Sequence, residues 1–272
     1  MDKLLQIGQN TLEESGVIDA KIDARLLLMH VLNCDRTHLI LNSQAGIEEK
    51  DVEKYIDFIQ RRAKRQPLQH ITNEQQFMGL SFYVDSRVLI PRQDTELLVE
   101  TVLEYKPKNV LEIGVGSGCI AISIAHFLQD TKVTAVDISG DAIEVAMQNA
   151  KANNVDIIFV QGDVFENVSG TFDLIVSNPP YIPHKETFDL MDEVINHEPH
   201  IALTDGGDGL EFYRRIAKDA KLHLNGILAL EIGHNQGNDV IQILENELYT
   251  NIRLLKDYND KDRVVVAEKN LR

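Results

Sequence analysis

Hydrophobic positions recur at a helical period through the N-terminal part of the chain. Apolar residues line one face of each predicted helix, at 2–15, 20–33, 37–42 and 48–65. Gly16 is expected to stop the first helix, Asp19 to cap the second, and Pro67 to end the helical region. No strand-like run and no phosphate-binding loop occurs here. This part is therefore predicted to be a small helical bundle, a module that holds a partner rather than one that performs chemistry.

A different pattern follows. Residues 77–92 alternate apolar and polar positions about Gly79 and Asp85, which predicts a β-hairpin. Asp94 is the expected N-cap of a helix at 95–105. The chain is accordingly divided into a helical domain at 1–72, a hairpin linker at 73–92 and a second domain at 93–272.

From residue 109 onward, short apolar runs of strand length alternate with segments of helical period. The predicted strands are 109–115, 132–138, 156–163, 172–177, 227–233, 251–257 and 263–269. The predicted helices are 118–129, 141–153, 210–224 and 237–248, with an insertion at 183–207. This alternation predicts an α/β fold whose mostly parallel sheet is covered on both faces. The last strand follows its predecessor without a full helix, so we expect it to pair antiparallel.

Composition limits the classes of partner. The chain has 272 residues and a formal net charge of −16, which would repel a polyanion over most of its surface. Its basic cluster, Arg61–Arg65, is expected to be a solvated helix end, and no direct nucleic-acid binding is predicted. No apolar run reaches the ~18 residues of a membrane span, and no signal-peptide block opens the chain. A cytoplasmic protein without a membrane partner is expected.

Cysteine and histidine give no metal-binding pattern. Cys34 and Cys119 are too few for a disulfide framework or a cysteine metal site, and Cys119 is expected to be a small buried residue. His197 and His200 form one H-x-x-H spacing without a carboxylate at metalloprotein spacing. No metal site is predicted.

The segment FDLIVSNPPYI predicts a buried strand that stops at Asn178-Pro179-Pro180-Tyr181. A Pro-Pro pair neither continues a strand nor starts a helix, so the chain leaves the sheet rigid and extended. Ligands bind at this end of an open α/β sheet. An amide that donates and accepts, followed by a backbone carbonyl fixed by proline, can hold a planar NH2 group through both hydrogens. A polar turn after a strand is the alternative.

A glycine-rich loop, Gly114-Val115-Gly116-Ser117-Gly118, lies between a predicted strand and a predicted helix. Its G-x-G-x-G spacing is not that of dinucleotide-binding proteins, and Glu112 just before it would repel a pyrophosphate and attract an ammonium group. Asp137 ends the next strand, where a carboxylate is expected to bind both ribose hydroxyls. Gly162-Asp163-Val164 ends the third strand, where a polar residue can reach an adenine amino group.

A ligand with an ammonium group, a ribose and an adenine but no phosphate is S-adenosylmethionine. Taken singly, the glycine loop could be a tight turn and Asp137 a turn residue beside the competing helix cap Ser139. The three features occur in order at successive strand ends and are followed by NPPY. Together they favour S-adenosylmethionine as the cofactor.

The chain resembles the HemK/PrmC family, the peptide chain release factor N5-glutamine methyltransferases, over nearly its whole length. The NPPY tetrapeptide is shared with enzymes that methylate adenine, whereas the IPR-x-TE and EP-x-x-AL-x-x-GG-x-DGL stretches are specific to this family. The stretches that carry the resemblance are LIPRQDTELLVE (89–100), LEIGVGSGCIAISIA (111–125), VSNPPYI (176–182), HEPHIALTDGGDGLEFYRRI (197–216), GILALEIG (226–233) and DRVVVAE (262–268).

The resemblance implies a class I, Rossmann-like methyltransferase fold with a seven-stranded, mostly parallel sheet, preceded by an all-α domain that recognises the release factor. It implies methyl transfer from S-adenosylmethionine to the glutamine amide of the GGQ tripeptide of class I release factors, with S-adenosylhomocysteine as product. We expect the protein to act as a monomer.

The resemblance also assigns roles by position. Gly114 to Gly118 would line the methionine part of the cofactor, Asp137 would hold the ribose, and Asp163 and Val164 would flank the adenine. Some relatives have an aromatic residue in place of Val164, and Phe165 is expected to substitute for it. The substrate amide would be held by Asn178, Pro179, Pro180 and Tyr181, with Asn178 also bordering the cofactor.

Three alternatives remain open. One is a methyltransferase that acts on a glutamine of a ribosomal protein, whose distinguishing features would lie in the N-terminal domain. Another is an adenine-N6 nucleic-acid methyltransferase, against which the acidic charge argues. The third is a module that holds the cofactor and docks release factors without catalysis, against which the intact NPPY argues.

Overall fold

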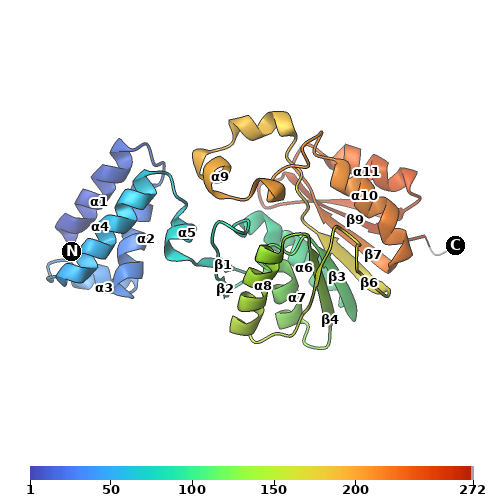
Figure 1. Cartoon of the computed structure of the whole chain (residues 1–272), viewed down its shortest axis with the longest axis horizontal. Helices are drawn as coiled ribbons and strands as arrows, with labels where there is room; N and C mark the ends of the chain where they lie inside the picture. Colours follow the sequence, from blue (N-terminus) through green and yellow to red (C-terminus); the bar gives the residue numbers. More distant parts are fainter. Residues whose placement is uncertain (271–272) are drawn as a thin grey trace. The chain divides into compact units, whose positions relative to one another are not determined.

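The computed structural model describes residues 1–270, which form two compact units (Figure 1). The first unit contains Met1–Glu74 and Met191–His197, and the second contains Gln75–Leu190 and the chain from Glu198 onward. The first unit is built from helices α1 Asp2–Glu14, α2 Ala20–Leu32, α3 Arg36–Leu41, α4 Glu49–Ala63, α5 Leu68–Thr72 and α9 Asp192–His197.

The predicted helices of this unit are confirmed to within a few residues, but the helical region does not end at Pro67. Pro67 instead precedes α5, where its missing N–H is no loss because the first amides of a helix lack intrahelical partners. Asp19 occupies the N-cap of α2 without a side-chain hydrogen bond, whereas Asp35 caps α3 by accepting from the His38 amide at 2.7 Å. Occupying the N-cap position therefore does not by itself give a capping hydrogen bond in this unit.

Tyr55 is the centre of the helical core. Its ring is fully buried, and its hydroxyl donates to the Ala24 carbonyl of α2 at 3.1 Å. A Cβ on Gly8 of α1 would lie 2.1 Å from this hydroxyl oxygen, so only glycine allows α1 to approach so closely. The remaining fully buried large side chains of this core are Leu12, Leu27, Leu28 and Ile59.

The expected solvated end of α4 is wrong for Arg62. This side chain is buried, and its Nε donates to Asp23 at 2.7 Å while its Nη2 lies 3.0 Å from Glu193 of α9. Arg65 adds a second contact to Glu193 at 2.8 Å. Burial raises the pKa of Asp23, and Arg62 opposes that rise. A segment of the 183–207 insertion is thus held in the helical unit by two arginines.

The second unit has a seven-stranded sheet in the order β5-β4-β3-β6-β7-β9-β8. All pairs are parallel except those of β9, which is antiparallel to both neighbours, as expected for the last strand. The strands are β3 Asn109–Ile113, β4 Lys132–Asp137, β5 Ile158–Gln161, β6 Phe172–Ser177, β7 Leu224–Glu231, β8 Thr250–Lys256 and β9 Asp262–Glu268.

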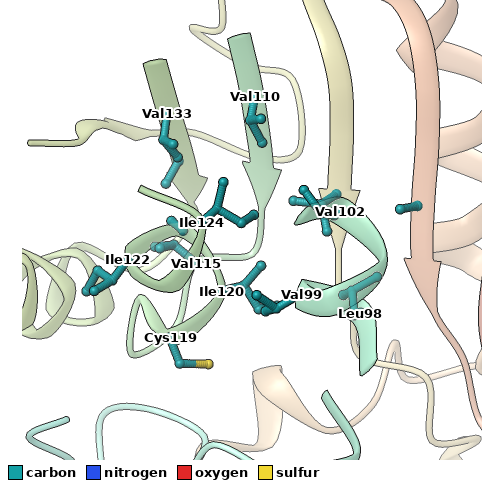
Figure 2. Packing of buried hydrophobic residues seen from close by; sticks show 14 of the residues in the cluster. Leu98, Val99, Val102, Val110, Val115, Cys119, Ile120, Ile122, Ile124 and Val133 are labelled. Atoms are coloured by element: carbon teal, nitrogen blue, oxygen red, sulfur yellow. The ribbon is translucent and has the colours of Figure 1, made fainter. Parts of the chain in front are cut away.

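Helices cover both faces of this sheet, because residues alternate between two cores along each strand. Val110 of β3 and Val133 of β4 meet α6 and α7 on one face (Figure 2), whereas Leu111 faces α10 and α11 on the other. The helical elements of this unit are η1 Gln93–Thr95, α6 Glu96–Tyr105, α7 Cys119–Phe127, α8 Gly140–Ala152, η2 His184–Asp189, η3 His200–Ala202, α10 Glu211–Asp219, η4 Ala220–Leu222 and α11 Gly237–Asn246.

The hairpin is shorter than the alternation of 77–92 suggested. Strands β1 Gln75–Phe77 and β2 Leu80–Phe82 pair antiparallel about Met78-Gly79, both at positive φ, and the chain around Asp85 is a turn rather than a strand end. The predicted N-cap at Asp94 is also wrong. Asp94 lies inside η1, and its carboxylate is 3.0 Å from Arg263, so tertiary pairing replaced the local cap.

The arginine contacts of the helical unit predict a stability effect. Arg62→Ala would leave the buried Asp23 carboxylate without its cation, while the half-buried Glu193 keeps its contact with Arg65. The free energy of unfolding should therefore fall by about 3–5 kcal/mol. Chemical denaturation, followed by hydrogen exchange of α2 and α4 amides, measures this. Lys50→Ala, which removes an exposed contact to Glu48, is the control and should leave stability unchanged. Equal stability of both variants would contradict the prediction.

Candidate functional site

The strand order reverses beside β3, and this reversal creates the site. From β3 the chain runs to β4 on one side, and later strands begin with β6 on the other. Ile113 at the end of β3 pairs with Ser177 at the end of β6, and the buried Ser177 hydroxyl donates to the Ile113 carbonyl at 2.7 Å. The glycine loop and NPPY therefore leave adjacent strand ends, at the switch point where open α/β sheets bind ligands.

A cavity lies at this switch point. It encloses about 1090 Å³ of non-atom space, counting open solvent at its mouth. Gly118 and Tyr181 do not line it. The other predicted site residues do, namely Glu112, Gly114, Val115, Gly116, Ser117, Asp137, Asp163, Val164, Asn178, Pro179 and Pro180.

The glycines of the loop serve two different purposes. Gly114 and Gly116 have φ of 77° and 51°, and a Cβ at either would meet nothing within 4 Å, so their backbone borders open space. A Cβ on Gly118 would lie 2.8 Å from Ile122 and 3.2 Å from Ala146. Gly114 and Gly116 thus let a ligand approach the backbone, whereas Gly118 lets α7 pack against α8.

Two carboxylates border the loop. Glu112 is buried, and its Oε2 accepts from the Ala121 amide in the first turn of α7 at 2.9 Å. Burial raises its pKa well above the ordinary value, so a cation in the cavity would be a favourable partner for the ionised form. Asp137 accepts from the Gly116 and Ser139 amides, each at 2.9 Å. Ser139 is the N-cap of α8, and Asp137, Gly116 and Ser139 all line the cavity.

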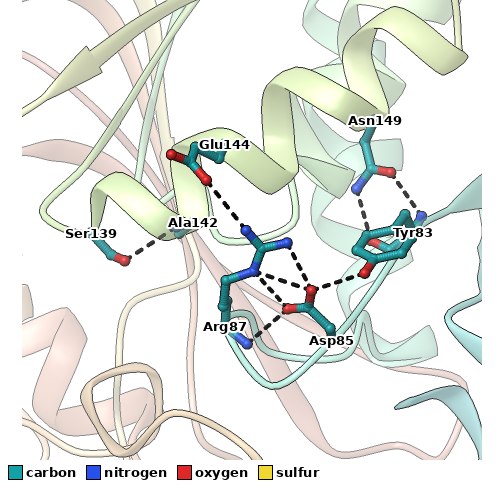
Figure 3. Close-up of polar contacts among 7 residues, drawn as sticks. All are labelled: Tyr83, Asp85, Arg87, Ser139, Ala142, Glu144 and Asn149. Atoms are coloured by element: carbon teal, nitrogen blue, oxygen red, sulfur yellow. Dashed lines mark hydrogen bonds and ion pairs between the residues drawn. The ribbon is translucent and has the colours of Figure 1, made fainter. Parts of the chain in front are cut away.

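Polar side chains of α8 and of the segment after the hairpin support the loop; Figure 3 shows the contacts of Asn149 with Tyr83 and of Arg87 with Asp85. Asn149 of α8 is buried, and its Nδ2 donates to the carbonyls of Ser117 and Tyr83, each at 2.9 Å. Its Oδ1 accepts from the Tyr83 amide at 2.7 Å. Beside it, the cavity-lining Arg87 is fixed by Asp85, with Nη2 2.8 Å from Oδ2. The loop geometry is therefore set by α8 and by the segment after the hairpin.

At the end of the third strand, Asp163 and Val164 line the cavity, but Phe165 does not take the place expected for it. Val164 lines the cavity at φ 59°, which is strained for a β-branched residue. The Asp163 carboxylate pairs with Arg215 at 2.8 Å while its residue also lines the cavity. Phe165 is not a lining residue, because its ring stacks on His223 with centroids 5.1 Å apart.

The NPPY segment is anchored by residues that sequence spacing did not single out. Asn178 donates through Nδ2 to the Thr95 hydroxyl at 3.2 Å. Gln236 is buried; its Nε2 donates to the carbonyls of Tyr181, at 2.9 Å, and Gly209, at 3.2 Å. Burial raises the pKa of the half-buried Tyr181 to about 12, so it stays neutral.

Another missed pair fixes the wall formed by Pro199, Ile201 and Ala202. The Glu198 side chain is only 1% exposed, and its carboxylate is 2.5 Å from Arg92. Burial raises its pKa, and Arg92 opposes the rise. Arg92 and Glu198 both lie in stretches that carry the family resemblance, so the sequence indicated that each is important. It did not indicate that the two side chains contact each other. Among residues 1–270, no group of three His, Cys, Asp or Glu side chains is placed to hold a metal ion.

The sheet order, the glycine loop and the cavity at the switch point define a class I methyltransferase. The family model described as Methyltransferase small domain matches residues 92–246, and PrmC N-terminal domain matches residues 3–72. A Release factor glutamine methyltransferase from Clostridium acetobutylicum is 45% identical over 90% of this chain and 90% of its own. One from Geobacter sulfurreducens is 40% identical over 97% and 94%. The chain therefore belongs to the release factor glutamine methyltransferase family.

A solved structure agrees on the fold. A methyltransferase from Pyrococcus furiosus has a TM-score of 0.56 and 22% identity, covering 71% of this chain and 91% of its own. Within residues 1–270, no helix has the length and apolar character needed to span a bilayer.

The close approach at Gly209 predicts a site-specific effect. A Cβ there would lie 2.3 Å from the Tyr181 carbonyl and 3.0 Å from Gln236, so Gly209→Ala should displace the NPPY segment. We expect methyl transfer to fall at least tenfold, with roughly unchanged cofactor affinity by calorimetry, because the glycine loop is untouched.

Gly206→Ala is the matched control, since Gly206 has φ 77° against 79° for Gly209 but open space at its Cβ. Both variants carry similar backbone strain. An equal loss of transfer in both would show that strain rather than the contact with Tyr181 is responsible.

Proposed function

We propose that this protein transfers a methyl group from S-adenosylmethionine to the N5 amide nitrogen of the GGQ glutamine of class I peptide chain release factors. The observation that carries the proposal is the placement of Asn178-Pro179 beside the glycine loop in one cavity, with Asn178 Nδ2 already donating to Thr95. The relatives named release factor glutamine methyltransferases support the choice of substrate. S-adenosylhomocysteine is the second product.

The residues present fit the cofactor. Open space above the Cα atoms of Gly114 and Gly116 leaves room for its methionine part, with Glu112 as the partner of the ammonium group. Asp137 would hold the ribose, and Asp163 and Val164 would border the adenine. When bound, S-adenosylmethionine supplies an electrophilic methyl group on a positively charged sulfur.

The chain's own contribution is to present the substrate nitrogen. An amide nitrogen is a poor nucleophile because its lone pair is delocalised into the carbonyl. Asn178 Oδ1 and the Pro179 carbonyl would each accept one N–H of the substrate, which aims the nitrogen and stabilises the positive charge that it gains as the N–C bond forms. The nitrogen then loses one of its two protons to solvent, leaving a neutral N5-methyl amide. Tyr181 would pack near the planar amide.

We further propose that the helical part recognises the release factor and that the protein acts as a monomer in the cytoplasm. The proposed division is a recognition domain at 1–72, a hairpin linker at 73–92 and a methyltransferase domain at 93–272. The match of residues 3–72 to a PrmC N-terminal domain supports the first of these.

Mass spectrometry of a purified class I release factor, incubated with this protein and S-adenosylmethionine, tests the proposal. One added methyl group on the GGQ glutamine is the expected result. A release factor in which that glutamine is replaced should gain no mass. Cofactor binding without any transfer would end the proposal and direct the search to ribosomal proteins and nucleic acid.

Asn178→Ala removes the acceptor of the substrate NH2 while leaving the glycine loop and Asp137 in place. We expect kcat to fall about 100- to 1,000-fold, the size of effect seen when a transition-state hydrogen bond is lost, with roughly unchanged cofactor affinity. Asn225→Ala, at an exposed position of β7, is the control and should retain full activity. Loss of cofactor binding along with transfer in Asn178→Ala would contradict this role.

A further inference from the structure

A buried carboxylate lies beside Asn178 and has no part in the chemistry described so far. Glu231 ends β7 and is 1% exposed. Leu230 pairs with Ser177 in the parallel β6–β7 register, so the next residues, Glu231 and Asn178, leave the two strand ends together. Within residues 1–270, Glu231 Oε2 has no hydrogen-bond partner.

Charged and titratable groups from several elements face this carboxylate. Burial raises the pKa of Glu231 to about 7. The nearby Thr95 and Asn178 side chains and the charge of Arg263 on β9 oppose this rise, and Asp94 of η1 adds to it. Burial raises the pKa values of the neighbouring Tyr181, Tyr213 and Cys119, and the charge of Glu231 adds to each rise.

Ionisation of Glu231 lowers the stability of the fold. Its pKa is about 7 when folded against an ordinary value of 4.5, so the folded protein binds the proton more tightly than the unfolded chain. Its contribution to the free energy of unfolding therefore decreases as the pH rises from about 4.5 to about 7 and stays low above that. A buried carboxylate that costs stability beside a substrate-binding amide is accounted for by function rather than by folding.

Asn178 has two amide ends of similar shape, and the proposed reaction uses only one of them. The Oδ1 end must face the substrate NH2, because the Nδ2 end would place donor against donor. The Thr95 hydroxyl accepts from Nδ2 at 3.2 Å. Because a hydroxyl can donate as well as accept, it could equally bind Oδ1, and it therefore does not fix the orientation of the Asn178 amide. An ionised carboxylate only accepts, and therefore selects Nδ2.

We propose that Glu231 is a positioning residue, which in its ionised form accepts from Asn178 Nδ2 and so turns Asn178 Oδ1 toward the substrate nitrogen. This inference rests on the proposed function. Protonated Glu231 offers an O–H donor, which accommodates the flipped amide equally well. Transfer should therefore require the ionised form.

The experiment compares Glu231→Gln and Glu231→Met with the wild-type protein from pH 5.5 to 9, using purified release factor and saturating S-adenosylmethionine. Wild-type kcat should decrease up to about tenfold per pH unit below pH 7. Both variants should lose about 10- to 100-fold of kcat at pH 8, with no pH break near 7, and Glu231→Gln should lose less, because its amide can still accept from Nδ2. The KM for the cofactor should change less than twofold.

Two controls separate positioning from structure. Asp94→Asn removes the carboxylate that pairs with Arg263 and leaves Asn178 in place, so it should keep the plateau kcat. Because Asp94 raises the pKa of Glu231, the pH break should move downward. Thermal unfolding without cofactor should show Glu231→Gln to be more stable than wild type at pH 8, with the difference vanishing toward pH 4.5. Titration of Glu112 would change cofactor affinity rather than kcat at saturation.

The outcomes are distinguishable. No methylation by the wild-type protein ends the proposed function and this inference with it. Methylation by the wild type with unchanged kcat in both Glu231 variants overturns the inference alone. So does a loss of kcat accompanied by loss of cofactor binding or by lower stability at pH 8, which would make Glu231 a structural residue. Loss of kcat and of the pH break, with stability gained, supports it.

Discussion

The parallel pairing of β3 with β6 is the constraint on which the site depends. Parallel strands end at the same edge of a sheet, and the strand order reverses beside β3, so helices cannot cover the gap between the two strand ends. The buried bond from Ser177 to the Ile113 carbonyl closes the two strands just before the chain leaves them. The glycine loop and the NPPY segment face one cavity because these two strand ends are neighbours.

Around that edge, polar side chains hold the segments that border the cavity. Asn149 fixes the glycine loop, Gln236 fixes the chain after NPPY, and Glu198 with Arg92 fixes one wall. Each of them satisfies backbone groups or a charge that would otherwise be unpaired in a low-dielectric interior. The cavity is consequently held in shape by side chains that are far apart in the sequence. Glu231 differs from them, because its Oε2 is left open at a cost in stability.

The helical unit includes a short segment, Met191–His197, from the second half of the chain. The 183–207 insertion gives Met191–His197 to the helical unit and its remaining residues to the methyltransferase unit. Glu193 is the anchor, through Arg62 and Arg65. A basic cluster that composition alone assigns to solvent is thus partly a buried ion-pair site, because charge pairing across 128 or more residues is invisible to a local pattern.

Local sequence determined the order and type of the elements, since a helical or strand period is imposed by which positions meet the core. It also predicted most of the residues that line the cavity, because Gly114, Gly116, Asp137 and Asn178 lie at fixed offsets from strand ends. Local sequence did not determine that Asp94 would pair with Arg263 rather than cap a helix, that Gly118 would serve helix packing, or that Gln236 and Glu231 would support the NPPY segment. Those outcomes depend on which distant residues the sheet register brings within hydrogen-bond distance, and only the tertiary structure sets that register.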